Sequence, residues 1–288
     1  MISNYHTHSR YCDGKGEPRE YVEYAIAHGF SALGFSGHGP LPYRNRFSIK
    51  QDDYLSYCNE IRALQAEYDG KLEIKLGLEI DYIPGIQEDF HPLVEKGGLD
   101  YSIGSVHLVT PPDKEETLRD TINRPDNAYF KATDWLWYID GGDPTPYDEG
   151  LKKHFNGDIH NAVKAFFFQN NAMIERNSPT IVGHIDKVVM HNRGRYFDMA
   201  DHWFKDLLYE TLQLIKEYEC ICEINTRGLY KGRHTDYYPS KETIIYMNSL
   251  NIPVMVGTDA HQPTDLTQFM GANEFLKEVG YKNIVSRL

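Results

Sequence analysis

The sequence predicts an α/β fold in which seven parallel strands close into a barrel. Short runs rich in apolar and β-branched residues alternate with longer amphipathic stretches along the chain. The alternation occurs seven times without any period in the sequence itself, which excludes a solenoid. Right-handed helical crossovers between parallel strands satisfy this order, and closure into a barrel is the simplest arrangement of them.

Each predicted strand is one of the short apolar runs. In order they are Ile2–His8, Ala32–His38, Leu72–Glu79, Tyr101–His107, Thr180–His184, Cys220–Asn225 and Pro253–Asp259. The predicted helices are Pro18–His28, Asp52–Tyr68, Gln87–Lys96, Asp158–Asn177, Asp201–Tyr218, Ser240–Leu250 and Leu266–Val279. Asp158 and Ser240 are suited to cap the N-termini of their helices, and Gly29 and Gly280 lie where glycine commonly ends one.

The regular alternation is interrupted once, between the fourth and fifth strands, by residues 108–157, here called the insert. It contains Pro111-Pro112, Trp135-Leu136-Trp137-Tyr138 and Asp140-Gly141-Gly142-Asp143. A connection this long at the carboxyl end of a strand commonly covers a site, although a surface excursion without such a role is the alternative. No linker rich in Pro, Gly or Ser divides the chain, so we expect residues 1–288 to form one domain.

Composition narrows the class of partner. A net charge of −12 disfavours a general binder of nucleic-acid backbones, which needs a basic face. The four cysteines have no CxxC spacing and are typical of reduced thiols in a cytoplasmic protein. The polar N-terminus carries no signal-peptide pattern, and no apolar run is long enough to span a membrane. The sequence does not indicate the oligomeric state.

Residue types that bind metals stand at or just beyond the ends of six predicted strands. His6 and His8 alternate along the first strand, so their side chains point to the same face. The full set is His6, His8, Asp13, His38, Glu79, His107, His184, Asp259 and His261. Any single member could be a buried histidine or a capping acid, but six strands would not all end this way by chance. Because barrel active sites lie at the C-terminal ends of strands, the pattern predicts two or three metal ions that share a carboxylate.

The same residues resemble a known family. His6-Thr7-His8 with Asp13, Gly37-His38, Gly77-Leu78-Glu79, Gly104-Ser105-Val106-His107, Gly183-His184-Ile185-Asp186 and Asp259-Ala260-His261 are similar to the motifs of the PHP (polymerase and histidinol phosphatase) superfamily. Pro40-Leu41-Pro42, Trp137-Tyr138-Ile139-Asp140-Gly141 and Glu223-Ile224-Asn225-Thr226 favour its histidinol-phosphate phosphatase branch. The resemblance spans nearly the whole chain and implies a distorted (β/α)7 TIM-like barrel with a trinuclear metal centre at the C-terminal ends of its strands.

Carried over by residue, the resemblance implies three divalent ions. One would bind His6, His8, Glu79 and Asp259; a second would share Glu79 and add His107 and His184; a third would bind Asp13, His38 and His261. Some family members have histidine where Asp13 stands, and a carboxylate there lowers the charge of that site. Nitrogen and oxygen ligands without thiolate suit Zn, Mn or Fe, and the sequence does not choose among them.

The implied activity is hydrolysis of the small molecule L-histidinol phosphate, a step of histidine biosynthesis, by a hydroxide that bridges two ions. Glu79 would share the ions, and Asp259 or His184 would donate a proton to the leaving group. Arg227 is the first candidate to bind the phosphate, followed by Lys187 and Arg233.

Other residues and other functions remain open. Trp135, Trp137 and Tyr138 could line a pocket for an imidazole ring, and Asp140 or Glu115 could hold the substrate amine. The alternative substrates are another small phosphate, such as a phosphotyrosine or a nucleotide, or the end of a nucleic acid. A module that binds metal without catalysis is the third alternative, although binding alone does not need nine convergent ligands.

Overall fold

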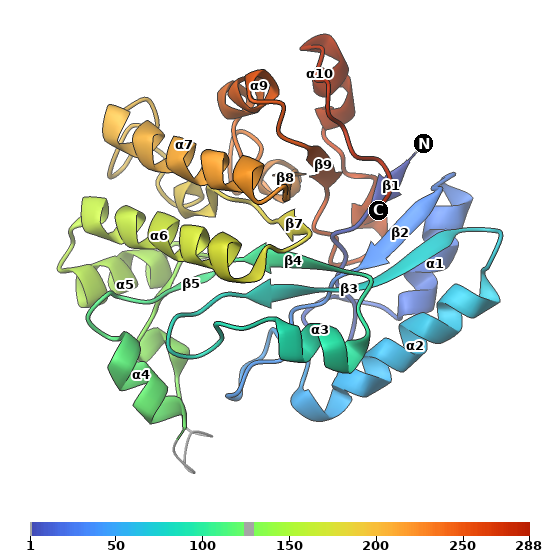
Figure 1. The fold of residues 1–288 in the computed structure, drawn as a ribbon, viewed down its shortest axis with the longest axis horizontal. Coiled ribbons are helices and arrows are strands. Elements are labelled where there is room, and N and C mark those ends of the chain that lie inside the picture. Colours follow the sequence, from blue (N-terminus) through green and yellow to red (C-terminus); the bar gives the residue numbers. More distant parts are fainter. Residues whose placement is uncertain (1, 124–129) are drawn as a thin grey trace.

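A parallel seven-stranded sheet forms the centre of the molecule in the computed structural model, which describes residues 2–123 and 130–288 (Figure 1). Its strands are β1 (Ser3–Asn4), β2 (Ala32–Phe35), β3 (Glu73–Asp81), β4 (Tyr101–Ser105), β7 (Ile181–Val182), β8 (Ile221–Asn225) and β9 (Val254–Gly257). They lie side by side in the order β1-β2-β3-β4-β7-β8-β9, and every neighbouring pair is parallel.

The two outer strands of this sheet approach each other, so the barrel is nearly closed. Beyond β1 and β9, the backbone N–H of His8 donates to the carbonyl oxygen of Ala260 (2.8 Å), and that of Ala260 donates to His6 (3.0 Å). At the other end of β9, the C-terminal segment takes up the open edge, where the Val285 N–H donates to the Val254 carbonyl (2.8 Å). The predicted (β/α)7 TIM-like barrel is confirmed.

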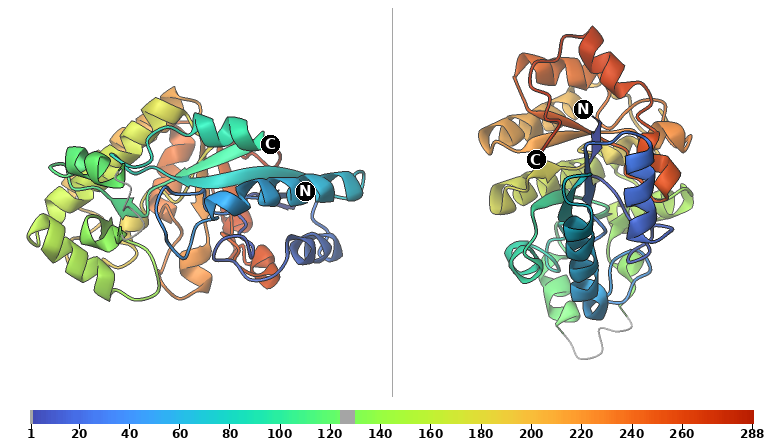
Figure 2. Two further views of the ribbon diagram at one scale, coloured as in Figure 1. Left: turned by 90° about the horizontal axis from the view of Figure 1, so that it is seen from below. Right: turned by 90° about the vertical axis from the view of Figure 1, so that its right-hand side faces the viewer.

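Helices surround the sheet on its outer side (Figures 1 and 2). They are α1 (Pro18–Ala27), α2 (Tyr54–Glu67), α3 (His91–Gly97), α6 (Ile159–Asn177), α7 (His202–Glu217), α8 (Arg227–Tyr230), α9 (Lys241–Ser249) and α10 (Ala272–Glu278), with short 3-10 turns η1 (Gln51–Asp53), η4 (Lys187–Val189) and η5 (Pro263–Thr267). The main core lies between these helices and the strands. A smaller cluster, which includes Tyr5, Ile103 and Met255, packs on the inner face of the strands.

The insert forms its own small layer beside the end of β4. It contains β5 (Leu108–Val109), α4 (Glu115–Ile122), η3 (Ala132–Asp134), β6 (Trp137–Tyr138) and α5 (Thr145–Phe155), and β5 pairs antiparallel with β6. Residues 124–129 of the insert lie outside the described residues. Immediately after β6, the Ile139 N–H donates to the carbonyl of His107 (3.1 Å), so the chain returns to the barrel at a predicted metal ligand.

Several element boundaries differ from the predicted ones. β3 extends two residues past Glu79 because Ile80 and Asp81 continue to pair with β4. The helix predicted over Leu266–Val279 is split into η5 and α10, since Met270 (φ 50°) and Gly271 (φ 77°) adopt left-handed backbone angles that a helix excludes.

Two predicted helix caps are confirmed. The Asp158 carboxylate accepts from the Asn161 N–H (3.1 Å), and the Ser240 hydroxyl accepts from the Thr243 N–H (3.3 Å). All four cysteines are free thiols, as predicted. Across residues 2–123 and 130–288, we find no helix with the length and apolar character that crossing a membrane requires.

Candidate metal centre

All nine predicted metal ligands lie at the C-terminal end of the barrel. His6 and His8 follow β1, His38 follows β2, His107 follows β4, and Asp259 and His261 follow β9. Glu79 lies inside β3 and faces inward, and His184 follows β7. Loops after parallel strands converge at one end of a barrel, and this brings residues far apart in sequence into contact.

Glu79 occupies the middle of this group and is almost completely buried, with 1% of its surface exposed. Both of its carboxylate oxygens face imidazole nitrogens. Oε2 approaches His6 Nε2 (3.3 Å), His8 Nε2 (3.4 Å) and His38 Nδ1 (3.1 Å). Oε1 approaches His184 Nε2 (3.0 Å) and His107 Nε2 (3.5 Å). One carboxylate therefore contacts five histidines from four strand ends.

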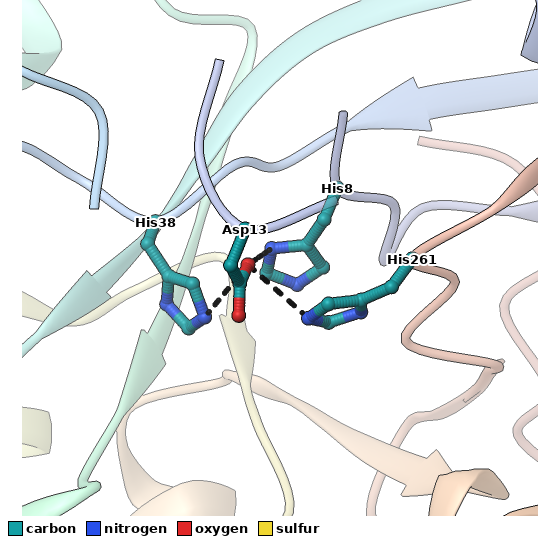
Figure 3. A group of neighbouring side chains, drawn as sticks. All are labelled: His8, Asp13, His38 and His261. Atoms are coloured by element: carbon teal, nitrogen blue, oxygen red, sulfur yellow. Dashed lines mark ion pairs between the residues drawn. The ribbon is translucent and has the colours of Figure 1, made fainter. Parts of the chain in front are cut away.

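Asp13 forms a second centre of contacts, nearer to solvent. Figure 3 shows its carboxylate among three imidazole rings. Its Oδ1 lies 3.2 Å from His261 Nε2, 3.7 Å from His8 Nδ1 and 3.8 Å from His38 Nε2. These four side chains offer ligand atoms that all lie within 4.8 Å of one another. Asp13 is thus placed with His38 and His261, as the resemblance implies, and His8 joins them.

Asp259 connects the two groups. Its Oδ1 lies 3.2 Å from His8 Nε2 and 3.3 Å from His261 Nδ1, and 3.8 Å from His6 Nε2. Asp259 has φ of 51° and His184 has φ of 21°, a backbone region that L-residues adopt only rarely.

The geometry fits metal ions better than hydrogen bonds. His6 Nε2, His8 Nε2 and His38 Nδ1 are buried, and none has a hydrogen-bond partner although each lies close to a carboxylate. Unpaired buried polar atoms are rare in native proteins. Two ligand atoms bound to the same tetrahedral ion at about 2.1 Å would lie roughly 3.4 Å apart. The observed separations of 3.1–3.8 Å between these nitrogens and carboxylate oxygens match that spacing.

Two further carboxylates, which are not among the predicted site residues, contact the Nδ1 atoms of two histidines. Glu223 Oε1 lies 2.6 Å from His6 Nδ1, and Asp81 Oδ1 lies 2.7 Å from His107 Nδ1. Both contacts leave the Nε2 atom of the ring facing Glu79. Buried carboxylates of this kind fix the tautomer and orientation of metal-binding histidines. The available signals in the sequence are Asp81, two residues after Glu79 on β3, and Glu223, an acidic residue between Cys222 and Ile224 in the buried β8.

Glu223 has additional partners that connect three strands. Its Oε2 accepts from the backbone N–H of His184 (3.1 Å) and from Asn225 Nδ2 (3.1 Å). Asn225 Nδ2 also lies 3.5 Å from Asp259 Oδ2. Space for the Glu223 side chain exists because residue 257 is glycine, since a Cβ at that position would overlap with Oε1.

The electrostatics favour ionised acids. Burial raises the pKa of Glu79 and of Asp259, but the surrounding groups, His6 first among them, outweigh burial and hold both pKa values well below the usual range. Burial, together with His261 and His38, lowers the pKa of His8 to about 3. For His107, burial is outweighed by Asp81 and Glu79, which raise its pKa to about 9. The central carboxylates are therefore available as anionic ligands.

Each predicted phosphate-binding cation lies beside a carboxylate of the site. Arg227, the first residue of α8, donates from NH1 to the carbonyl of Asp259 (2.6 Å), and its Nε lies 3.9 Å from Asp259 Oδ2. Lys187 is 2% exposed, and its Nζ lies 3.3 Å from Asp140 Oδ2. Arg233 NH1 lies 4.0 Å from Asp140 Oδ1. The structure thus places Lys187 and Arg233 beside the same carboxylate, that of Asp140, and Arg227 beside Asp259.

Comparison with known proteins adds relatives of similar length. A histidinol-phosphatase of Bacillus subtilis (strain 168) is 28% identical over 279 residues, which cover 91% of this chain and 94% of that protein. A solved structure from Listeria monocytogenes superimposes with a TM-score of 0.76 at 22% identity, covering 92% of this chain and 97% of the other. A histidinol phosphate phosphatase from Lactococcus lactis, solved with zinc, L-histidinol and phosphate, gives a TM-score of 0.66 at 22% identity and covers 98% and 95%.

At this identity the two solved structures bear on the fold, and both share its barrel. The family model described as the PHP domain matches residues 4–227, which include seven of the nine predicted ligands. The remaining two, Asp259 and His261, lie beyond the matched range, yet the structure brings them into contact with His8. On this match over most of its length, the chain belongs to the PHP domain family.

Proposed function

We propose that this protein is a histidinol-phosphatase, a metal-dependent phosphomonoesterase that hydrolyses L-histidinol phosphate to L-histidinol and phosphate. The observation that carries the proposal is the convergence of nine ligand-type side chains, with Glu79 and Asp13 among them, at one end of the barrel. Phosphoryl transfer requires dense, fixed positive charge around the phosphate, and a cluster of metal ions provides it. The related histidinol-phosphatase of Bacillus subtilis supports the choice of substrate.

Three divalent ions are proposed, with the ligands that the resemblance implies. His6, His8, Glu79 and Asp259 would hold the first; Glu79, His107 and His184 the second; Asp13, His38 and His261 the third. Side-chain groups able to hold an ion occur at His6/His8/Asp259, at His38/Glu79/His107 and at His8/Asp13/His38/His261, which supports several neighbouring ions. The last two groups share His38 and the first and last share His8, so each of these histidines lies between two neighbouring groups.

Divalent ions held there would activate a water molecule at neutral pH and neutralise the charge that develops on the phosphate. The residues of the chain orient this chemistry. Glu79 lies between the histidines and would be shared by two of the ions. Asp259 and His184 both lie at the centre, and one of them would deliver the proton that the leaving alkoxide requires.

Arg227, Lys187 and Arg233 would bind the phosphate. The guanidinium of Arg227 is held by the Asp259 carbonyl and by Tyr230, whose hydroxyl lies 3.3 Å from NH1, so its position relative to the centre is fixed. A fixed guanidinium suits phosphate oxygens, because its planar donors match their geometry. We also propose that the 288 residues act as one domain and that the insert covers the site, since Asp140 of the insert lies 3.9 Å from His107 Nε2.

The competing function is hydrolysis of another small phosphate by the same centre. Nothing in the ligand cluster itself discriminates among phosphate esters. The net charge of −12 disfavours nucleic acid as a substrate.

A substrate panel tests the proposal. Purified protein of measured metal content is offered L-histidinol phosphate, aryl phosphates including phosphotyrosine, a nucleoside monophosphate and single-stranded DNA, and kcat/KM is compared. We expect L-histidinol phosphate to be preferred by about an order of magnitude or more, the difference that about 1.4 kcal/mol of selective transition-state binding gives. Equal rates for all small phosphates would reject the specific assignment and leave a general phosphatase, whereas preference for DNA would reject both.

A further inference from the structure

Asp140 is an acidic residue where a phosphate-binding site needs positive charge. Its Oδ2 lies 3.3 Å from Lys187 Nζ and 3.9 Å from His107 Nε2. Its Oδ1 accepts from the N–H of Gly141 (2.6 Å) and lies 4.0 Å from Arg233 NH1. The carboxylate is therefore anchored by its own turn, close to two proposed phosphate-binding cations and one proposed metal ligand.

This position has an electrostatic consequence. The Lys187 ammonium and the Arg233 guanidinium both lie within 4.0 Å of the Asp140 carboxylate, and these neighbouring positive charges favour its ionised form. Asp140 is thus an anion in the resting protein. A phosphate dianion held by the same cations would lie close to this carboxylate, and like charges repel more strongly in a partly buried site than in water. A phosphate ester with no other charge is penalised at this position.

A substrate that carries its own cation next to the phosphate removes the penalty. The ammonium group would take the place of Lys187 as the partner of one Asp140 oxygen and release Lys187 for the phosphate. Side-chain exposure of 20% leaves Asp140 accessible to a small ligand. Asp140 comes from the insert, after β6, and is not itself among the side chains proposed to hold metal.

We infer that Asp140 is a specificity-determining residue, which selects phosphomonoesters that carry an ammonium group on the carbon next to the phosphorylated CH2 group and disfavours neutral alkyl or aryl phosphates. This inference rests on the proposed function, because L-histidinol phosphate is such an amino-alcohol phosphate. On this inference, the enzyme selects its substrate by the charge of the amine rather than by contacts with the imidazole ring. Repulsion of the wrong ligands is a common means of specificity.

The test compares two substrates and three proteins. The substrates are L-histidinol phosphate and imidazolylpropyl phosphate, which is the same molecule without its amine. The proteins are the wild type, Asp140→Asn and Asp143→Asn. Asp143 is an exposed acid of the same insert whose carboxylate accepts from the Thr145 N–H (2.9 Å), so its variant is a matched control. Metal content is measured for all three.

We expect Asp140→Asn to lower kcat/KM for L-histidinol phosphate by about 10-fold to 100-fold, as loss of a charged hydrogen bond does. The same variant should hydrolyse imidazolylpropyl phosphate as fast as the wild type or faster, because the repulsion is gone. Asp143→Asn should match the wild type on both substrates.

An equal loss on both substrates would overturn the inference, since it would mean that Asp140 serves only to hold Lys187. The inference would also be overturned if Asp140→Asn kept the wild-type preference for L-histidinol phosphate over imidazolylpropyl phosphate. If the metal-loaded wild type hydrolysed neither compound, the proposed function itself would fail, and the inference with it. If the wild type hydrolysed both equally well, only the role of Asp140 would be rejected.

Discussion

At the scale of single residues, the site depends on how each imidazole is held. The ring of His6 is fixed between two carboxylates, with Nδ1 2.6 Å from Glu223 and Nε2 3.3 Å from Glu79. His107 is held in the same way by Asp81 and Glu79. The direction of the Nε2 lone pair is therefore set partly by Glu223 and Asp81, which are not among the proposed metal ligands.

Replacing Glu223 by Gln tests this support. Glu223 accepts from donors at both oxygens, and the amide of Gln would oppose one of them with its own N–H groups. A buried donor left without an acceptor costs about 1–3 kcal/mol. We expect metal affinity, measured by titration of the metal-free protein, to fall about 10-fold to 100-fold. The control is Glu217→Gln, an exposed acid at the end of α7. Unchanged metal affinity in Glu223→Gln would show that His6 needs no such support.

Arg227 separates phosphate binding from metal binding. Its side chain is held by the Asp259 carbonyl but is not among the proposed ligands. We predict that Arg227→Ala raises KM for L-histidinol phosphate by about 10-fold to 100-fold, because a charged hydrogen bond is lost, and that it retains its metals. Arg227→Lys should recover only part of the loss, since it keeps the charge without the fork of donors. Loss of metal in Arg227→Ala would instead mean that the residue holds Asp259 in place.

At the scale of elements, the strand ends and the turns after them position the ligands. The alternation of His6 and His8, and their recurrence with His38, His107 and His184, could be read from the sequence because barrel strands all end on one face. The roles of Asp81 and Glu223, the carboxylates that hold His107 and His6, were harder to predict from the sequence. The sequence predicts that β3 ends at Glu79 and so gives Asp81 no role. In the structure β3 continues to Asp81 because these residues pair with β4. Glu223 faces inward in a strand whose apolar neighbours hid its role.

The contact between β9 and β8 allows a test of Glu223 that removes no polar group from the protein. A methyl group at Gly257 would overlap with Oε1 of Glu223. We therefore expect Gly257→Ala to displace Glu223 and, through it, His6, and to lower metal content and kcat together while the far-ultraviolet circular dichroism remains that of the wild type. The control is Gly39→Ala, because a Cβ there would meet its nearest neighbour at 3.5 Å, an ordinary contact. Wild-type activity in Gly257→Ala would show that Glu223 can move without consequence.

At the scale of the whole molecule, one barrel end combines residues from both ends of the chain. The Thr7 to Ala260 bridge joins the region after β1 to the region after β9, and His8 stacks on His261 across it with ring centroids 4.0 Å apart. The seven-stranded order was predictable from periodicity and the near-closure from topology. The contacts of the insert with the site were not predictable. Asp140 lies near His107 and Lys187 because the chain comes back to the barrel after β6, and no sequence pattern indicates this.

The central claim is that a single carboxylate, Glu79, unites the metal centre and that the centre performs the hydrolysis. The most direct test measures metal equivalents per chain by mass spectrometry, together with release of phosphate from L-histidinol phosphate, for the wild type and for Glu79→Gln. Glu79 contacts five histidines, so its amide replacement is predicted to lose metal and to abolish hydrolysis. A Glu79→Gln protein with wild-type metal content and full activity would contradict the account.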